Sequence, residues 1–160
     1  MTQVEVRPAQ PGEWRAVGGL RWDSLAEFGG EAHESRDVFA DRFAEWAAAH
    51  RDTHECFVAV GEGTVVGMTW LATLPRVPSA RAFDRASGDV QCAYVVPELR
   101  NDGIGGRLID AVLARAAECE LERVTVHSSP RAVVVYERHG FAVEDRLLHV
   151  YVAHPDAVRA

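Results

Sequence analysis

The sequence predicts one mixed α/β (α+β) domain over residues 1–160, in which a twisted mixed sheet of six or seven strands is flanked by about four helices. Segments in which apolar residues alternate, as they do in strands, are interspersed with segments of helical period. Their order is β-α-α-β-β-β-α-β-α-β, with room for one further strand at the end, and this order is typical of a sheet covered by helices. The 160 residues contain no repeat, low-complexity tract or linker, so one domain accounts for the whole chain.

The first third of the chain predicts a strand followed by two helices. Val4 and Val6 alternate with polar residues before Pro8, which indicates a short strand. Apolar residues then recur at helical spacing over residues 11–28 and again over residues 36–49. Two consecutive glycines end the first of these helical segments.

A hairpin and a long loop are expected next. Two β-rich runs, residues 56–60 and 64–71, flank Gly61-Glu62-Gly63, which is a strong signal for a β-hairpin. Residues 74–88 contain two prolines, three arginines and little periodicity, so we expect a loop there. Long loops in compact domains are often functional, and this one is expected to close over a substrate.

The second half of the chain alternates strands and helices. A strand is expected over residues 89–96 and a helix over residues 103–118, where apolar residues repeat every four positions. A further strand follows at residues 123–126 and a short helix at residues 130–138. One or two strands are expected over residues 141–151.

The charge composition excludes several classes of function. All 17 basic residues are arginines, and with 24 acidic residues the net charge is −7 and the pI about 5.5. A nucleic-acid binder is not expected, because such proteins need a basic face to displace counterions from phosphates. Without lysine there is no Schiff-base lysine, no lysine nucleophile and no P-loop lysine. The preference for Ala, Arg, Val and Gly over Lys and Asn is typical of a GC-rich, bacterial genome.

Cysteine usage and hydropathy point to the cytoplasm. Cys56, Cys92 and Cys119 are odd in number and form no C-x-x-C pair, which favours a reducing compartment over a disulfide framework. No signal peptide and no stretch of about 18 apolar residues is present, so no association with a membrane is expected. His50 and His54 have zinc-like spacing but no evident third ligand, so we expect no metal.

A glycine-rich turn between a predicted strand and a predicted helix is the most informative segment. The run Arg100-Asn101-Asp102-Gly103-Ile104-Gly105-Gly106 places about four free backbone N–H groups at a helix start, where the helix dipole also favours a phosphate. The adjacent arginines, Arg100 and Arg107, can add positive charge. The run is not the dinucleotide fingerprint G-x-G-x-x-G, and it lacks the Lys-Ser/Thr of a P-loop. The alternative is that the glycines only shape a tight turn.

Two motifs in this half of the chain resemble those of a known family. The run R-x-x-G-x-G-G after a strand ending V-V-P resembles the acetyl-CoA-binding motif of the GCN5-related N-acetyltransferases (GNAT family). The run Val135-Tyr136-Glu137-Arg138-His139-Gly140-Phe141 is similar to that family's Y-x-x-x-G-F segment. One helix and one strand separate the two motifs, as in the family, and the resemblance covers about residues 89–150. It implies a GNAT-like fold.

The resemblance implies coenzyme-binding and catalytic roles for particular residues. The backbone of Val95 and Val96 would pair with the pantetheine arm as an added strand does, and an N–H group of one of them would polarise the acyl carbonyl. The hydroxyl of Tyr136 would protonate the departing thiolate. Two positions depart from the family pattern: Asp102 adds a carboxylate to the phosphate loop, and Ser-Ser-Pro-Arg stands where many members have Asn. The residues implied to bind the coenzyme are Tyr94, Val95, Val96, Arg100, Asn101, Asp102, Gly103, Ile104, Gly105, Gly106, Ser128 and Arg131.

The general base and the acceptor site have weaker signals. Alternation along the strand puts Asp89 on the same face as Val95, which makes Asp89 the candidate base, with His127 as a further candidate. The alternative for Asp89 is a strand-start residue that caps a turn. Glu27 and Glu31 lie where the resemblance puts the acceptor and are candidates for binding a cationic amine; the alternative is a solvated acidic face.

Together these observations predict an acetyl-CoA-dependent N-acetyltransferase in which a primary amine attacks the thioester directly. Acetyl-CoA would be a co-substrate, the acceptor a small-molecule or peptide amine, and the resemblance also allows a homodimer. The acidic balance of the chain favours a cationic acceptor, whereas the arginines of residues 74–88 suit an anionic one. The alternatives are a non-catalytic acyl-CoA sensor or interaction module, and a nucleotide or sugar-phosphate binder that uses only the glycine turn.

Overall fold

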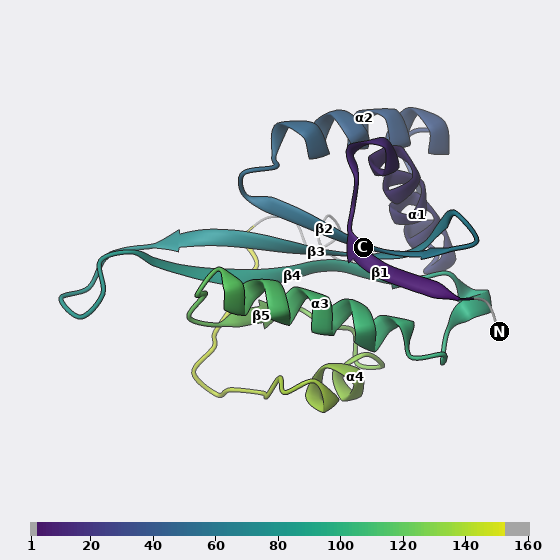
Figure 1. Ribbon diagram of the computed structural model, residues 1–160. Coiled ribbons are helices and arrows are strands. Elements are labelled where there is room, and N and C mark those ends of the chain that lie inside the picture. Colours follow the sequence, from purple (N-terminus) through teal and green to yellow (C-terminus); the bar gives the residue numbers. More distant parts are fainter. Residues whose placement is uncertain (1–2, 153–160) are drawn as a thin grey trace.

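The computed structural model describes residues 3–152, and within them the chain forms a five-stranded mixed sheet with helices on both faces (Figure 1). The strands are β1 (Val4–Pro8), β2 (His54–Gly61), β3 (Thr64–Arg76), β4 (Arg85–Val95) and β5 (Val124–Val126). The α-helices are α1 (Trp14–Glu27), α2 (Arg36–Ala49), α3 (Ile104–Glu118) and α4 (Val133–Arg138), and the 3-10 turns are η1 (Pro11–Glu13) and η2 (Pro97–Leu99). The strands lie in the order β1-β2-β3-β4-β5, antiparallel except that β5 runs parallel to β4.

Each face of the sheet has its own hydrophobic core. On one face, α3 packs against the sheet with a buried stripe that recurs every four residues, at Ile104, Leu108, Val112 and Ala116. The opposite core lies under α1 and α2 and includes Val17, Met68 and Trp70. Helices thus cover both faces of the sheet, and the candidate site lies where β4 ends and α3 begins.

The β2–β3 hairpin confirms the prediction made from its turn residues. Glu62 and Gly63 have φ values of 51° and 75°, and Gly61 pairs with Thr64. Two consecutive left-handed residues are what a two-residue hairpin turn of type I′ requires. The predicted helix over residues 36–49 is also confirmed, and Ser35 caps it by accepting a hydrogen bond from the Val38 N–H group.

The expected loop at residues 74–88 is too long, because residues 74–76 belong to β3 and residues 85–88 to β4, which leaves residues 77–84 between the strands. β3 continues to Arg76 and β4 begins at Arg85, with Leu74 opposite Ser87, and the two strands form an arm that projects beyond the rest of the sheet (Figure 1). Leu74, Val77 and Phe83 are exposed on this arm. A strand shows alternating apolar and polar residues when one of its faces is buried. This two-stranded arm is exposed, so the sequence lacks that alternation and did not predict its strands.

The expected number of strands, six or seven, is also wrong, because the described residues form five. Residues 141–152 contain no strand, although their sequence is rich in β-branched and aliphatic residues. Val143, Leu148 and Val150 are at least 80% exposed. Since β-propensity reflects packing against neighbouring strands, an apolar segment without a partner strand does not adopt the conformation that its composition favours.

A bulge in β4 changes the direction of its side chains. Trp70 pairs with Gln91 and Met68 with Tyr94, so Cys92 and Ala93 together lie opposite a single β3 residue, and Cys92 has a φ of 56°. The extra residue reverses the alternation beyond it. The prediction that Asp89 shares a face with Val95 is therefore wrong: Val95 packs against the α3 core, whereas the partner of Asp89, Ala72, is on the side of the α1 core.

The bulge also coincides with an opening in the sheet. β5 pairs with β4 only over residues 88–90, so among the described residues β4 has no strand beside it from Gln91 to Val95 on that edge. Cys92 and Ala93 are exposed although β4 is an internal strand. An open edge of this kind presents backbone hydrogen-bonding groups to an extended ligand.

Candidate active site

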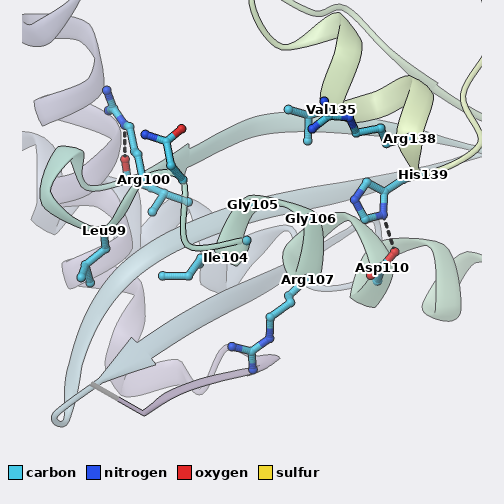
Figure 2. Close-up of a pocket in the computed structure, with 13 residues that line it drawn as sticks. Leu99, Arg100, Ile104, Gly105, Gly106, Arg107, Asp110, Val135, Arg138 and His139 are labelled. Atoms are coloured by element: carbon cyan, nitrogen blue, oxygen red, sulfur yellow. Dashed lines mark hydrogen bonds and ion pairs between the residues drawn. The ribbon is translucent and has the colours of Figure 1, made fainter. Parts of the chain in front are cut away.

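A cavity of about 620 Å³ lies where β4 ends and α3 begins (Figure 2). Its walls come from three segments: the end of β4 with the following loop, the first two turns of α3, and α4. The residues that line it are Val95, Leu99, Arg100, Asn101, Gly103, Ile104, Gly105, Gly106, Arg107, Asp110, Val135, Arg138 and His139. The structure thus brings together most of the sequence-predicted phosphate loop and part of the Y-x-x-x-G-F segment.

The loop before α3 presents a series of unpaired N–H groups to this cavity. Asn101 and Gly103 have φ values of 71° and 77°, and these left-handed residues turn the chain into the helix. The first helical hydrogen bond of α3 runs from the Arg107 N–H group to the Gly103 carbonyl, at 3.1 Å. The N–H groups of residues 104–106 lie before it in the chain and have no partner within the helix. Within residues 3–152 no acceptor is found for the N–H groups of residues 101–106. Such donors at the positive end of a helix favour a phosphate group.

The glycines of this turn have different surroundings. A Cβ atom on Gly105 would meet no protein atom within 4 Å, so this position is open. A Cβ atom on Gly106 would lie 2.7 Å from His139 Nε2, so Gly106 allows α4 to approach α3. His139 also binds Asp110 through Nδ1, at 2.6 Å (Figure 2). Asp102 is exposed.

Arg100 binds the end of α1 rather than facing the N–H groups of the loop. Its two terminal nitrogens donate to the Glu27 carboxylate at 2.6 and 2.7 Å, and its Nε donates to the Val95 carbonyl at 2.9 Å. The Tyr94 hydroxyl donates to the same carboxylate at 2.8 Å, and the guanidinium carbon of Arg100 lies 5.3 Å from the Tyr94 ring centroid. These three residues join α1 to the end of β4 and to the loop before α3.

The charges in this cluster shift the acidities of its members. Hydrogen bonds from Arg100 hold the pKa of the Glu27 carboxyl below its ordinary value, and the Arg131 guanidinium adds to this more weakly. Burial, and then the hydrogen bond to Glu27, raise the pKa of Tyr94 to about 12. Glu27 therefore stays ionised near neutral pH. Glu31 is not part of the cluster; it lines a separate cavity of about 210 Å³ with Arg21 and other residues.

The backbone at the end of β4 distinguishes between Val95 and Val96. The Val96 N–H group donates to the Val66 carbonyl at 2.9 Å, within the sheet. The Tyr94 carbonyl faces β3 beside Gly67, so the N–H group of Val95, on the other side of the same peptide plane, points toward the open edge. Only Val95 therefore offers a backbone donor on that edge at this point.

Tyr136 lies on α4 inside the core that α3 forms with the sheet. Its side chain is 7% exposed and its ring packs edge-on against Phe141, with centroids 5.2 Å apart. No hydrogen-bond partner for its hydroxyl is found among the described residues. Burial raises the pKa of Tyr136, so the hydroxyl keeps its proton near neutral pH. Tyr136 and Ser128 line a neighbouring cavity of about 320 Å³.

Asp89 has a fixed orientation on the α1 face of the sheet. One carboxylate oxygen accepts a hydrogen bond from the Thr125 hydroxyl at 2.9 Å and the other from the Gln91 side chain at 3.0 Å. Asp89 is the fifth residue of β4, so it does not cap the start of the strand. It lines a cavity of about 390 Å³ together with His127, His149 and neighbouring residues. The rings of these two histidines have centroids 5.9 Å apart.

Sequence reasoning missed three polar residues of the first cavity: Asp110, Arg138 and His139. Two of them stand inside the Y-E-R-H-G-F run, where only the tyrosine was assigned a role. A signal for the third was present, because Gly106 and Asp110 are four residues apart and so share a face of the helix. No group of three or more His, Cys, Asp or Glu side chains within residues 3–152 is placed to hold a metal ion. None of the helices found there has the length and hydropathy needed to cross a bilayer.

A family model for an acetyltransferase (GNAT) domain matches residues 23–149, which include the cavity. No curated protein sequence matches the chain significantly.

Solved structures share the fold at low sequence identity. A predicted acetyltransferase with acetyl-CoA from Clostridium acetobutylicum is 19% identical, with a TM-score of 0.76 over 93% of this chain and 96% of that one. Glucosamine-6-phosphate N-acetyltransferase from Arabidopsis thaliana is 15% identical, with a TM-score of 0.73 over 94% and 99% of the two chains. Ribosomal-protein-alanine N-acetyltransferase from Brucella melitensis biovar Abortus 2308 is 18% identical, with a TM-score of 0.73 over 93% and 98%.

Proposed function

The chain belongs to the GNAT acetyltransferase family, and from this premise we propose that it transfers an acetyl group from acetyl-CoA to a primary amine. The observation that carries the proposal is the series of unpaired N–H groups over residues 101–106, which lines a cavity beside the open edge of β4. A diphosphate at the start of α3 and an extended pantetheine arm along β4 use both features at once. A nucleotide without the pantetheine arm would use only the first of them.

The open edge of β4 suits the acyl group. An amide of the pantetheine arm can pair with the strand where β5 has diverged from it. The N–H group of Val95 then points at the space where the thioester carbonyl would lie, as a donor for the oxyanion that forms during attack. The left-handed Cys92 and the exposed Ala93 keep this part of the strand uncovered.

The reaction that we propose is a direct displacement. The acceptor ammonium gives one proton to the general base, and the lone pair of the neutral amine then forms a bond to the acetyl carbon, giving a tetrahedral intermediate whose oxyanion faces the Val95 N–H group. The intermediate collapses, the carbon–sulfur bond breaks, and the thiolate of coenzyme A takes a proton from the Tyr136 hydroxyl. The nitrogen of the new amide loses its second proton, which returns through water to the Tyr136 phenolate. Tyr136 is suited to this because burial keeps its hydroxyl protonated and no partner among the described residues competes for the proton.

Asp89 is the residue that we propose as the general base, acting directly or through water. Both of its oxygens are oriented by neighbouring donors, and it faces the cavity of about 390 Å³ that also contains His127. Asp89 projects from the α1 side of β4, opposite the side on which Val95 packs. The acceptor would therefore approach the thioester from the side away from the α3 core.

Glu27 is not free to bind a cationic acceptor through an unpaired carboxylate oxygen. Both of its oxygens already accept hydrogen bonds, from Arg100 and Tyr94. We propose that it positions Arg100 and α1 around the acceptor site. The acceptor remains a small-molecule or peptide amine; similar folds include enzymes of an amino sugar phosphate and of a ribosomal-protein alanine, so amines of both kinds belong in a screen.

The experiment that tests the proposal measures coenzyme binding and turnover in parallel. Calorimetry with CoA, NAD and ATP gives the binding preference, and release of free thiol from acetyl-CoA in the presence of an amine panel gives the activity. We expect binding of CoA but not of NAD or ATP, and thiol release that falls at least 100-fold in Asp89→Asn with CoA affinity unchanged. Binding without turnover for any amine would favour an acyl-CoA-binding module, and no binding of CoA would contradict the proposal.

A further inference from the structure

Three arginines line the cavity at the start of α3, and two of them already have partners. Arg100 holds the Glu27 carboxylate through two hydrogen bonds. Arg107 donates to the Val4 carbonyl at 2.9 Å, on the β1 side of the cavity. Arg138 has no carboxylate within 4.0 Å among the described residues. It is the arginine on the α4 wall of this cavity, and its guanidinium has no hydrogen-bond or ion-pair partner among the described residues.

The position of Arg138 is fixed by its neighbours. It is the last residue of α4, and the next residue, His139, binds Asp110 on α3 at 2.6 Å and packs against Gly106. These contacts hold the end of α4 over the first turns of α3. Figure 2 shows Arg138 on the α4 wall of the cavity near Val135, with Gly105 and Gly106 between it and Arg107.

Coenzyme A carries its negative charge at two separate places. The diphosphate joins the pantetheine arm to the ribose, and a phosphomonoester is attached to the ribose 3′ oxygen. The N–H groups of residues 101–106 suit the diphosphate, because backbone donors at a helix start hold phosphate oxygens without a cation. The phosphomonoester carries a charge of about −1.5 to −2 near neutral pH, and a guanidinium group recognises it best.

We infer that Arg138 binds the 3′-phosphate of coenzyme A and gives the site its preference for coenzyme A over the 3′-dephospho form. This inference rests on the proposed coenzyme site and adds to it a specificity-determining residue. His139 and Asp110 act as positioning residues, because they fix the end of α4 from which the Arg138 side chain extends.

The test is calorimetric titration of CoA and of 3′-dephospho-CoA into the wild-type chain, Arg138→Ala and Arg51→Ala. The control, Arg51, lies over the Trp14 ring and lines a different cavity, and its loss changes the net charge by the same amount. We expect the wild type to prefer CoA at least 10-fold. Arg138→Ala should lose that preference by weakening CoA alone, and Arg51→Ala should keep it.

The opposite results are equally informative. If the wild type binds both forms equally, or if Arg138→Ala weakens both forms to the same extent, Arg138 does not read the 3′-phosphate and the inference is wrong, while the coenzyme site stands. If neither form binds to the wild type, the proposed function itself is contradicted. Thermal melting of each variant checks that it is folded. We expect Arg138→Ala to keep the Tm of the wild type, because Arg138 is exposed and makes no ion pair in the described part of the chain.

Discussion

Replacing Gly105 with alanine tests the coenzyme site with very little disturbance of the protein. Gly105 is the second residue of α3 and its φ is not positive, so an L-residue fits its backbone. A Cβ atom there meets no protein atom within 4 Å, and the residue lines the cavity. The new methyl group therefore takes space from a ligand and not from the protein.

The two expected effects have opposite signs. Alanine in place of glycine in a helix stabilises by up to about 1 kcal/mol, which for a domain of this size raises the Tm by about 2–4 °C. A methyl group between the helix start and a phosphate lengthens or breaks charge-assisted hydrogen bonds, each worth about 1.5–3 kcal/mol. Loss of one such bond weakens CoA binding by roughly 10- to 100-fold. Gly105→Ala should thus be more stable and bind CoA less tightly.

Calorimetry with CoA and thermal melting without ligand measure both effects. Gly12→Ala is the matched control, because Gly12 also has open space around its Cβ position and its φ is not positive, but it lies in η1, outside the cavity. This control should leave CoA affinity unchanged. Unaltered CoA affinity in Gly105→Ala, with the protein folded, would show that no phosphate approaches the start of α3 and would refute the reasoning.

Three further changes have expected outcomes. Tyr136→Phe should lower kcat about 100-fold, with CoA affinity and Tm nearly unchanged because the hydroxyl has no partner within the described residues; steady-state kinetics check this, and an unchanged kcat removes Tyr136 as the acid. Glu27→Gln should lower the Tm at neutral pH by about 2–4 °C, since the ion pair with Arg100 is about one-third exposed and worth no more than about 1 kcal/mol. Because Arg100 lowers the pKa of Glu27, the stabilisation from this ion pair is complete above about pH 4.3 and is lost as the pH falls through the lowered pKa. The Tm values of wild type and Glu27→Gln should therefore converge in acid. A Tm difference that does not change with pH would contradict the ion pair between Glu27 and Arg100. Replacing residues 77–84 by Asn-Gly should leave CoA affinity unchanged, since none of them lines the cavity at the start of α3, and a weakened affinity in calorimetry would show that the arm reaches the site.

The sequence predicted the elements that have a buried face. Helix α3 has an apolar stripe of regular period, and the β2–β3 turn has the residues that its backbone demands, so both could be predicted from local chemistry. The arm of residues 74–88 and the segment 141–152 could not, because their conformations depend on which strands lie beside them. The turn and helix start at residues 100–106 could be predicted for the same reason as the hairpin turn, because their glycines are a local feature.

The candidate site was harder to predict where it depends on contacts between distant residues. Arg100 seemed to offer its charge to the phosphates, but Glu27, 73 residues earlier in the chain, binds it in the structure. The face on which Asp89 lies was mispredicted because a bulge leaves no clear signal in a single sequence. Arg138 stood within a recognised motif, and only the packing of α4 against α3 brings it to the cavity.

The bulge in β4 also determines where this strand can change in length. Asp89 and Val95 are six residues apart, which in a regular strand would place them on one face, but Cys92 and Ala93 together take one position opposite β3 and so put them on opposite faces. Deleting one of these two residues would remove the bulge, keep the pairs Trp70–Gln91 and Met68–Tyr94, and leave both faces as they are. Deleting one residue elsewhere between Asp89 and Val95, with the bulge retained, would exchange the faces on one side of the deletion. Among related chains, a one-residue gap in this strand is therefore compatible with both cores only at the bulge.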